Sequence, residues 1–120
     1  MSIALFRIAA ALCFLAVALG AFGAHALRST LEGRGTLSTW NTAVLYHFIH
    51  AIALLALALY GTGNRGAWWL LFAGIFFFSG SLYLMALIRQ PPDWLGAVTP
   101  LGGLCFLAGW AWLVVVGPRL

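Results

Sequence analysis

Four apolar runs, each about as long as a membrane-spanning helix, limit most strongly what this chain can fold into. Within the 120 residues, they cover roughly residues 3–27, 40–60, 67–88 and 95–116. A helix needs about 20 consecutive apolar residues to cross the hydrocarbon core of a bilayer. A helix also satisfies its backbone hydrogen bonds internally, which the bilayer requires. The sequence therefore predicts an all-α integral membrane protein with four transmembrane helices.

The composition favours a membrane protein over a soluble one. Only 7% of the residues are charged and 64% are hydrophobic, whereas about 25% of the residues in a soluble domain are charged. The net charge of +4 comes from six arginines and two acidic residues. The arginines are scattered near the ends of the apolar runs, as membrane-flanking residues are. We therefore expect membrane lipid, and no nucleic acid, as a partner.

The breaks between the runs are short and are polar or turn-forming. They contain the segments RSTLEGRGTLST, GTGNRG and RQPPDW. Glycine and asparagine favour turns, and a Pro-Pro pair does not continue a helix. Short connections make successive helices antiparallel neighbours. The whole chain, residues 1–120, is therefore predicted to be a single domain, an antiparallel four-helix transmembrane bundle.

The start of the chain also resembles a secretory signal peptide. Arg7, the apolar stretch after it and the segment Ala24–Ala26 (AHA) imitate the charged, apolar and cleavage regions of such a peptide. The apolar region of a signal peptide spans only about 7–15 residues, however. The first run is longer than this, so we expect it to be a retained transmembrane helix.

Four crossings place both ends of the chain on one side of the membrane, called side A, with side B opposite. The arginines divide equally, with Arg7, Arg65 and Arg119 on side A and Arg28, Arg34 and Arg89 on side B. The positive-inside rule therefore does not choose an orientation. Aromatic residues collect at both membrane surfaces. Those expected at side B are Trp40 and Trp94, and those expected at or near side A are Tyr60, Trp68, Trp69, Trp110 and Trp112.

Small residues recur where helices can touch. Ala16, Gly20 and Ala24 are four residues apart in the first run. The third and fourth runs contain Gly74, Gly80, Gly102, Gly103 and Gly109. Small residues let transmembrane helices approach closely. We expect these faces to pack helix against helix, and they also make a homo-oligomer plausible.

All four runs bring polar residues to the half of the membrane nearest side B. The candidate cluster consists of His25, Tyr46, His47, His50, Ser79, Ser81, Tyr83 and Thr99. His47 and His50 share a helix face, and at ~1.5 Å per residue they lie roughly 10 and 15 Å from side B. Polar groups in a membrane usually face the bundle interior or a wet cavity. We therefore predict a small polar chamber open to side B, with Arg28, Arg34 and Arg89 around its rim.

Four motifs occur in an order that resembles a known family. They are LGAFGAHAL (Leu19–Leu27), the segment Trp40–Leu55 with LYH and FIHAIALL, FSGSLY (Phe78–Tyr83) and TPLGGLCFLAGW (Thr99–Trp110). Together they resemble the domain-of-unknown-function 423 family, which includes transmembrane protein 256-like proteins and small bacterial inner-membrane proteins. The resemblance implies a four-helix protein of the bacterial cytoplasmic membrane with both termini in the cytoplasm. It implies no catalytic residues.

Several kinds of site are compatible with the candidate cluster. His25, His47 and His50 are residues of the type that binds a metal, and histidines on facing helices hold a b-type haem. Histidine and tyrosine also suit a proton or small-solute path, although the spans contain no carboxylate of the kind that carries protons. The rim arginines suit the phosphate of a lipid head group, because the guanidinium binds it through two donors. A serine and a histidine could form a nucleophile and base, but the carboxylates Glu32 and Asp93 lie in loops.

The hypothesis that we favour is structural. The polar side chains would cross-link the helices by hydrogen bonds, each worth on the order of 1 kcal/mol or less. The chain would then be a structural, accessory or assembly protein of a larger membrane complex, with no enzymatic activity and no cofactor. Cys13 and Cys105 are inside apolar runs, and we expect them to be small buried hydrophobes. The chamber hypotheses predict instead a solvent-reachable void beside His25 and His50.

Overall fold

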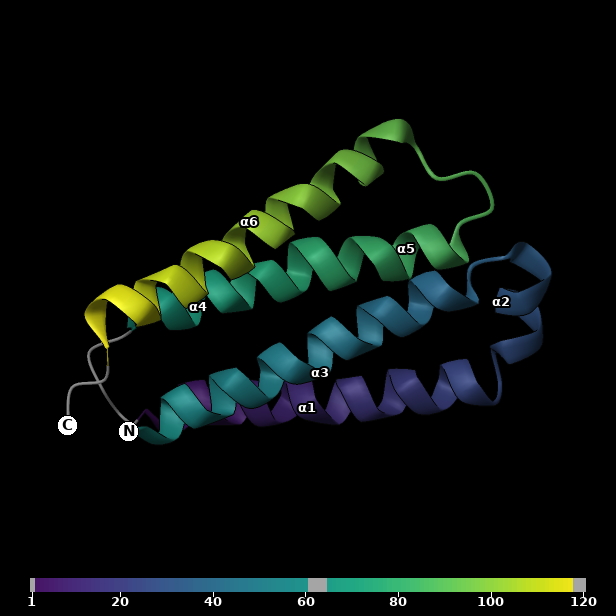
Figure 1. The fold of residues 1–120 in the computed structure, drawn as a ribbon. Helices are drawn as coiled ribbons and strands as arrows, with labels where there is room; N and C mark the ends of the chain where they lie inside the picture. Colours follow the sequence, from purple (N-terminus) through teal and green to yellow (C-terminus); the bar gives the residue numbers. More distant parts are fainter. Residues whose placement is uncertain (1, 61–64, 118–120) are drawn as a thin grey trace.

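Four antiparallel helices of membrane-spanning length form the part of the molecule that the structure describes. This structure is a computed structural model and describes residues 2–60 and 65–117. Its elements are α1 (Ile3–Ala24), α2 (Arg28–Arg34), α3 (Leu37–Tyr60), α4 (Arg65–Gly74), the π-helical η1 (Ile75–Gly80), α5 (Ser81–Leu87) and α6 (Asp93–Val116). The helices long and apolar enough to cross a membrane are α1, α3, the continuous span Arg65–Leu87 and α6. Successive spans run in opposite directions (Figure 1), so the predicted all-α four-span fold is confirmed.

The ends of the spans differ from the predicted ends by at most three residues. The first span stops at Ala24 because the backbone leaves the helical conformation at His25, with φ −123° and ψ −81°. The short helix α2 follows, in a segment for which the sequence predicted only a polar break. It is anchored by Leu31, which is fully buried in a cluster with Trp40 and Ala86. The predicted turn at residues 61–64 and the predicted side-A residue Arg119 lie outside the described residues.

The third span, Arg65–Leu87, is not a regular α-helix. It consists of α4, η1 and α5, and η1 is wound as a π-helix over Ile75–Gly80. A π-helical turn is wider than an α-helical turn and is found frequently at functional sites. Here the turn lies directly against α6, since a Cβ atom added at Gly102 would lie 2.2 Å from the backbone nitrogen of Phe78. The sequence predicted neither the wider turn nor this backbone contact.

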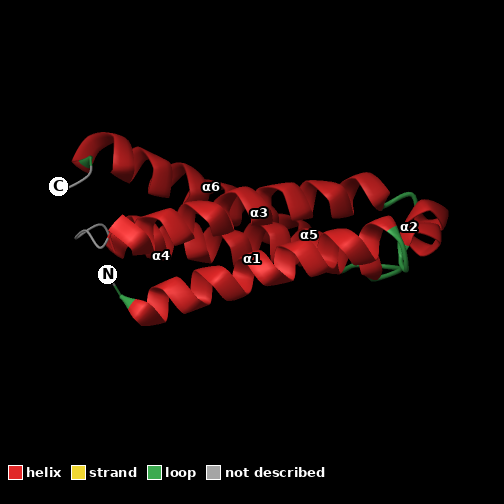
Figure 2. Ribbon diagram, turned by 90° about the horizontal axis from the view of Figure 1, so that it is seen from below, coloured by secondary structure: helices red, strands yellow, loops and turns green. Residues whose placement is uncertain are grey.

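The spans lie beside one another in the order in which they follow along the chain (Figure 1). α3 packs against α1 on one side and against the third span on the other, and α6 packs against the third span. In the described ranges, no Cα atom of α6 comes within 8 Å of a Cα atom of α1 or α3, and α1 and the third span do not approach this closely either. The array is therefore open, with α1 and α6 at its edges. Figure 2 shows the same helices along the 50 Å length of the molecule.

Several of the predicted small residues make room for large neighbours. A Cβ atom would lie 2.3 Å from the Phe106 ring if it were added at Gly74, and 2.7 Å from Leu71 if it were added at Gly109. Close helix packing is therefore confirmed at Gly74 and Gly109, as it is at Gly102. Such an atom at Gly80 or Gly103 would lie 3.9 Å or more from its nearest neighbour, an ordinary van der Waals distance, so close packing within this chain does not require glycine at these two positions.

Two of the predicted surface aromatics have buried side chains. Trp40 and Trp68 are each 1% exposed, although they lie near the expected ends of their helices. Trp40 Nε1 donates to the Leu19 carbonyl at 2.9 Å, and Trp68 Nε1 donates to the Leu54 carbonyl at 3.1 Å. A buried indole needs such an acceptor, so these rings join helices and do not face the membrane surface. Trp94, in contrast, is 66% exposed.

Candidate functional site

His50 is bonded through both of its ring nitrogens. Its Nδ1 lies 2.7 Å from the Tyr46 carbonyl, and Trp110 Nε1 donates to its Nε2 at 3.0 Å. An indole N–H can only donate, so Nε2 carries no proton and the neutral ring is protonated at Nδ1. The ring also stacks on Phe106, with centroids 3.6 Å apart and planes 12° apart. His50 therefore joins α3 to α6, whose backbones stay apart.

His47 is bonded through only one ring nitrogen. Its Nδ1 lies 2.9 Å from the Tyr83 hydroxyl, which joins α3 to α5. Its Nε2 is the one buried side-chain nitrogen or oxygen without a hydrogen-bond partner in the described part of the chain. The Leu12 carbonyl approaches the ring from α1, but it does not meet hydrogen-bond geometry with Nε2. A buried polar group without a partner costs about 1–3 kcal/mol.

The two candidate serines join the third span to its neighbours. Ser79 in η1 is fully buried and donates to the Ala43 carbonyl of α3 at 2.8 Å. Ser81 in α5 donates to the Phe78 carbonyl at 2.9 Å, and its hydroxyl is 2.5 Å from that of Thr99 in α6. Neither serine is bonded to a histidine, so the structure does not assemble a serine–histidine pair.

The two candidate histidines of α3 point to different neighbours and not into one shared polar chamber. α3 directs His47 toward Tyr83 of α5 and directs His50 toward Trp110 of α6. The surface beside His50 is a groove of about 610 Å³ with a mainly apolar lining, which we call the α3–α6 groove. Its lining residues are Tyr46, His50, Phe78, Pro100, Gly103, Leu104, Phe106, Leu107 and Trp110.

His25 lies apart from the other candidate residues. It is the C-cap of α1 and its side chain is exposed. Its backbone N–H donates to the carbonyls of Ala21 and Phe22, and its carbonyl accepts from the Arg28 N–H at 3.4 Å. Over residues 2–60 and 65–117, no three histidine, cysteine or acidic side chains come together as a metal site would need. The structure therefore does not join His25 to His47 and His50. Cys13 and Cys105 are free and half-buried.

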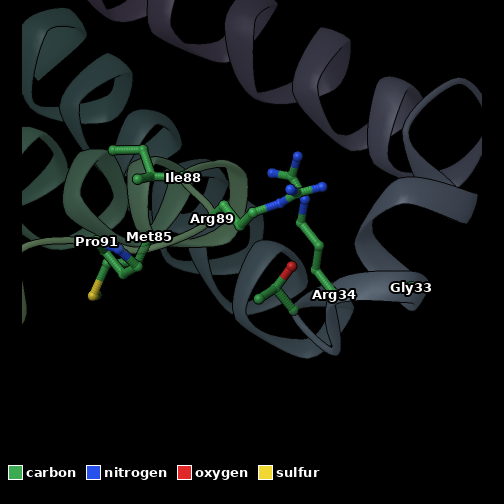
Figure 3. Close-up of a pocket in the computed structure, with 7 residues that line it drawn as sticks. Gly33, Arg34, Met85, Ile88, Arg89 and Pro91 are labelled. Atoms are coloured by element: carbon green, nitrogen blue, oxygen red, sulfur yellow. The ribbon is translucent and has the colours of Figure 1, made fainter.

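Two of the three predicted rim arginines come together, although not beside the histidines. Arg34 and Arg89 line a pocket of about 470 Å³ at the side-B end of the molecule (Figure 3). We call it the arginine pocket, and its lining residues are Gly33, Arg34, Thr36, Met85, Ile88, Arg89 and Pro91. Arg28 is not part of it, because its Nε pairs with Glu32 at 2.9 Å on the exposed face of α2.

Comparison with known proteins assigns a family to this open array of four spans. The model of a family described as "Protein of unknown function (DUF423)" matches residues 19–103. The chain belongs to the DUF423 family. The matched range includes all eight candidate cluster residues and the arginine pocket, whereas Phe106 and Trp110 lie beyond it.

Relatives of this DUF423 protein are membrane proteins of bacteria and a yeast. It is 45% identical over 116 residues to the UPF0382 membrane protein SH2409 of Staphylococcus haemolyticus, covering 92% of this chain and 93% of that protein. It is 44% identical over 111 residues to the UPF0382 membrane protein YwdK of Bacillus subtilis, covering 88% of each. It is 41% identical over 113 residues to the UPF0382 inner membrane protein YgdD of Escherichia coli, covering 89% of this chain and 83% of that protein. No solved structure matches the chain.

Two residues that complete the His50 site were not predicted to belong to it. Trp110 was expected at or near the side-A surface, and Phe106 was not singled out. Gly74 of the third span makes room for the Phe106 ring, but a glycine in the sequence does not show which side chain packs on it. The sequence does not point to Trp110 either, because a tryptophan near a helix end equally fits a membrane surface.

Proposed function

We propose that this DUF423 protein is a structural or accessory membrane protein, not an enzyme, and that it acts without a metal or organic cofactor. The bonding of His50 is the observation that supports this most directly. Its Nδ1 is engaged by the Tyr46 carbonyl and its Nε2 by the Trp110 indole. Neither nitrogen is left to bind a metal or to take a proton from a nucleophile. On this proposal, the polar residues hold the helices of an open array in place.

We assign the α3–α6 groove to a partner, which we propose is a membrane-spanning helix. The groove faces lipid, since Leu104 is 61% and Leu107 is 68% exposed. The backbones of α3 and α6 do not approach each other there, so the space between them is bridged only by side chains. A partner helix would gain van der Waals contact with the aromatic lining and with bare backbone at Gly103, and this kind of contact drives helix association in lipid. The helix comes either from a second copy of this chain or from another subunit of a larger complex.

Photo-crosslinking in native membranes tests this assignment. A photoreactive side chain replaces Leu107 in the groove, and in a control it replaces Phe14 on α1, which is 73% exposed. We expect a discrete protein adduct from position 107 and only lipid adducts from position 14. An adduct of twice the mass of the chain identifies a second copy, and a heavier or lighter adduct identifies another subunit. Equal yields of protein adduct at both positions, or no protein adduct at position 107, would overturn the proposal.

We further propose that the protein resides in a bacterial cytoplasmic membrane with both ends of the helical array on the cytoplasmic side. The Escherichia coli relative is named an inner membrane protein, which supports this membrane for the present chain. The beginning of α1 and the end of α6 lie at the same end of the molecule (Figure 1), so one orientation places both in the cytoplasm. The arginine pocket is then on the periplasmic side.

A further inference from the structure

The arginine pocket lies where three segments of the chain meet at the side-B end. Arg34 ends α2, Thr36 precedes α3, and Arg89 follows α5. None of these residues contributes to the histidine bonds or to the α3–α6 groove. The arginine pocket is therefore a separate feature of the molecule, and its role does not depend on the accessory function proposed above.

Arg34 is held in position by the protein. Its Nη1 donates to the Leu87 carbonyl at the last residue of α5, and Thr36 Oγ1 donates to the Ala86 carbonyl at 3.0 Å. The last carbonyls of a helix have no partner within the helix, so these two donors satisfy them. A guanidinium has five N–H donors. Arg34 therefore keeps free donors while its position is set by this contact.

Arg89 adds a second positive charge that the described chain does not balance. Figure 3 shows its guanidinium beside that of Arg34. Arg89 makes no hydrogen bond or ion pair with any residue in the ranges 2–60 and 65–117. The pocket lining includes no carboxylate, and Glu32 is already paired with Arg28. Two adjacent like charges repel each other, and an anion between them is attracted by both and offsets this repulsion.

The position of the pocket indicates which anion fits. It lies just beyond the ends of the spans Leu37–Tyr60 and Arg65–Leu87, at the level of a membrane surface. Trp94 at the start of α6 is 66% exposed, as an aromatic residue at this surface is expected to be. Phosphate groups of phospholipids lie at this level, and guanidinium groups bind phosphate through paired donors. Met85, Ile88 and Pro91 supply apolar lining beside the charges, which suits the glycerol and first acyl carbons of a lipid.

We propose that Arg34 and Arg89 form a binding site for a phosphate group, carried by an anionic phospholipid or by a soluble phosphate ester. The site is distinct from the chamber predicted beside His25 and His50. Arg34 donates hydrogen bonds from a guanidinium whose position is fixed by its bond to the Leu87 carbonyl. Arg89 supplies a second, unpaired positive charge that binds the phosphate from the other side. Arg28, only six residues from Arg34, does not take part because Glu32 neutralises it.

Binding to the delipidated full-length protein in detergent tests the proposal. Native mass spectrometry measures the affinity for phosphatidylglycerol, for diacylglycerol with the same chains, and for glycerol phosphate. The variants are R34Q, R89Q and, as a matched control, R28Q. We expect phosphatidylglycerol to bind more tightly than diacylglycerol, and R34Q and R89Q to weaken it by roughly tenfold each, as the loss of a charge-assisted hydrogen bond implies. R28Q should bind as the unchanged protein does.

The outcomes separate the source of the phosphate and can overturn the site. If glycerol phosphate binds without lipid and competes with phosphatidylglycerol, the ligand is a soluble phosphate ester. If only phosphatidylglycerol binds, the ligand is the head group of a lipid. Equal binding of diacylglycerol, an equal loss in R28Q, or unchanged binding in R89Q would overturn the proposal. R34Q also removes a contact to Leu87, so its fold is checked by circular dichroism. R89Q removes no hydrogen bond or ion pair within the described chain, so it keeps the test decisive if R34Q unfolds.

Discussion

At the scale of single residues, two histidines three positions apart on α3 are bonded differently. His50 has a partner at each ring nitrogen, the Tyr46 carbonyl and the Trp110 indole. His47 has the Tyr83 hydroxyl at Nδ1 and no partner at Nε2. His50 is therefore a complete cross-link between helices, whereas His47 is a cross-link that carries the cost of a buried unpaired nitrogen. The two sites should respond differently to substitution.

Replacing Trp110 by phenylalanine should destabilise the protein through His50. The change removes the indole N–H that donates a hydrogen bond to His50 Nε2, and it leaves this nitrogen without a partner in the membrane. We expect the free energy of unfolding to fall by about 1 kcal/mol, as measured for stronger interhelical hydrogen bonds in membranes. Unfolding by sodium dodecyl sulfate in mixed micelles measures it. Trp69→Phe is the control, since Trp69 is 50% exposed and its N–H bonds to no described residue. An equal loss of stability in this control would show that the size of the ring, and not the hydrogen bond, causes the effect.

His47 and Tyr83 should tolerate joint replacement better than single replacement. His47→Phe leaves the Tyr83 hydroxyl unpaired, so we expect a loss of about 1–3 kcal/mol in the free energy of unfolding. The double variant His47→Phe/Tyr83→Phe removes both partners and also the unpaired Nε2. It should lie close to the unchanged protein or above it in stability. A double-mutant cycle from the same unfolding measurement checks this, and additive losses from the two single changes would contradict it.

At the scale of elements, the third span depends on a bare patch of α6. η1 is a π-helical turn, and the backbone of Phe77 and Phe78 within it touches α6 at Gly102. Backbone cannot move aside as the end of a flexible side chain can. The neighbouring Gly103 faces the α3–α6 groove, where its added Cβ would approach Phe78 no closer than 3.9 Å. Adjacent glycines on one helix therefore have different roles.

Alanine at Gly102 should push α6 away from η1. The added Cβ would lie 2.2 Å from the Phe78 nitrogen and 2.7 Å from the Phe77 carbonyl carbon. We expect a loss of about 2 kcal/mol or more in the free energy of unfolding, at the upper end of overpacking costs. Gly103→Ala is the matched control, and it should be neutral or stabilising by up to ~1 kcal/mol because alanine favours a helix. Similar effects at both positions would mean that the close backbone contact does not set the position of α6.

At the scale of the whole molecule, the spans form an open array with two edges. α1 is attached along α3, and α6 along the third span. The bonds Trp110–His50 and Ser81–Thr99 tie α6 to the spans on its inner side. The polar residues concentrate on these internal joints, and both outer edges face lipid. On the function proposed above, such an array completes its packing against other membrane helices.

Labelling from outside the cell tests the orientation of the array. Cysteine replaces Thr30 in the exposed part of α2, or Tyr60 at the opposite end of α3, in a chain whose Cys13 and Cys105 are changed to alanine. Because the two positions lie at opposite ends of the spans, a membrane-impermeant maleimide should label only one of them in intact bacteria. We expect labelling at position 30 before permeabilisation and at both positions after it. Labelling of position 60 alone in intact cells would reverse the proposed orientation.

The sequence by itself determined how many spans the chain has, where they end within three residues, and where each polar residue lies along its span. These are local properties, since they depend on the length of an apolar run and on the polarity of the residues that flank it. Position along a helix converts directly into depth. The all-α four-span fold and the gathering of Arg34 and Arg89 at the same end of the molecule follow from this alone.

Only the tertiary structure decided what each polar group touches. A helix that is apolar on all sides has no face that its sequence marks as inward, so depth does not reveal the rotation of a helix about its axis. That rotation sends His47 toward α5 and His50 toward α6, and it turns Trp40 and Trp68 inward. The π-helical turn in η1 likewise lies where the third span meets α6 at Gly102. A contact between two helices depends on the sequences and the relative rotation of both, so the sequence of one helix alone does not predict it.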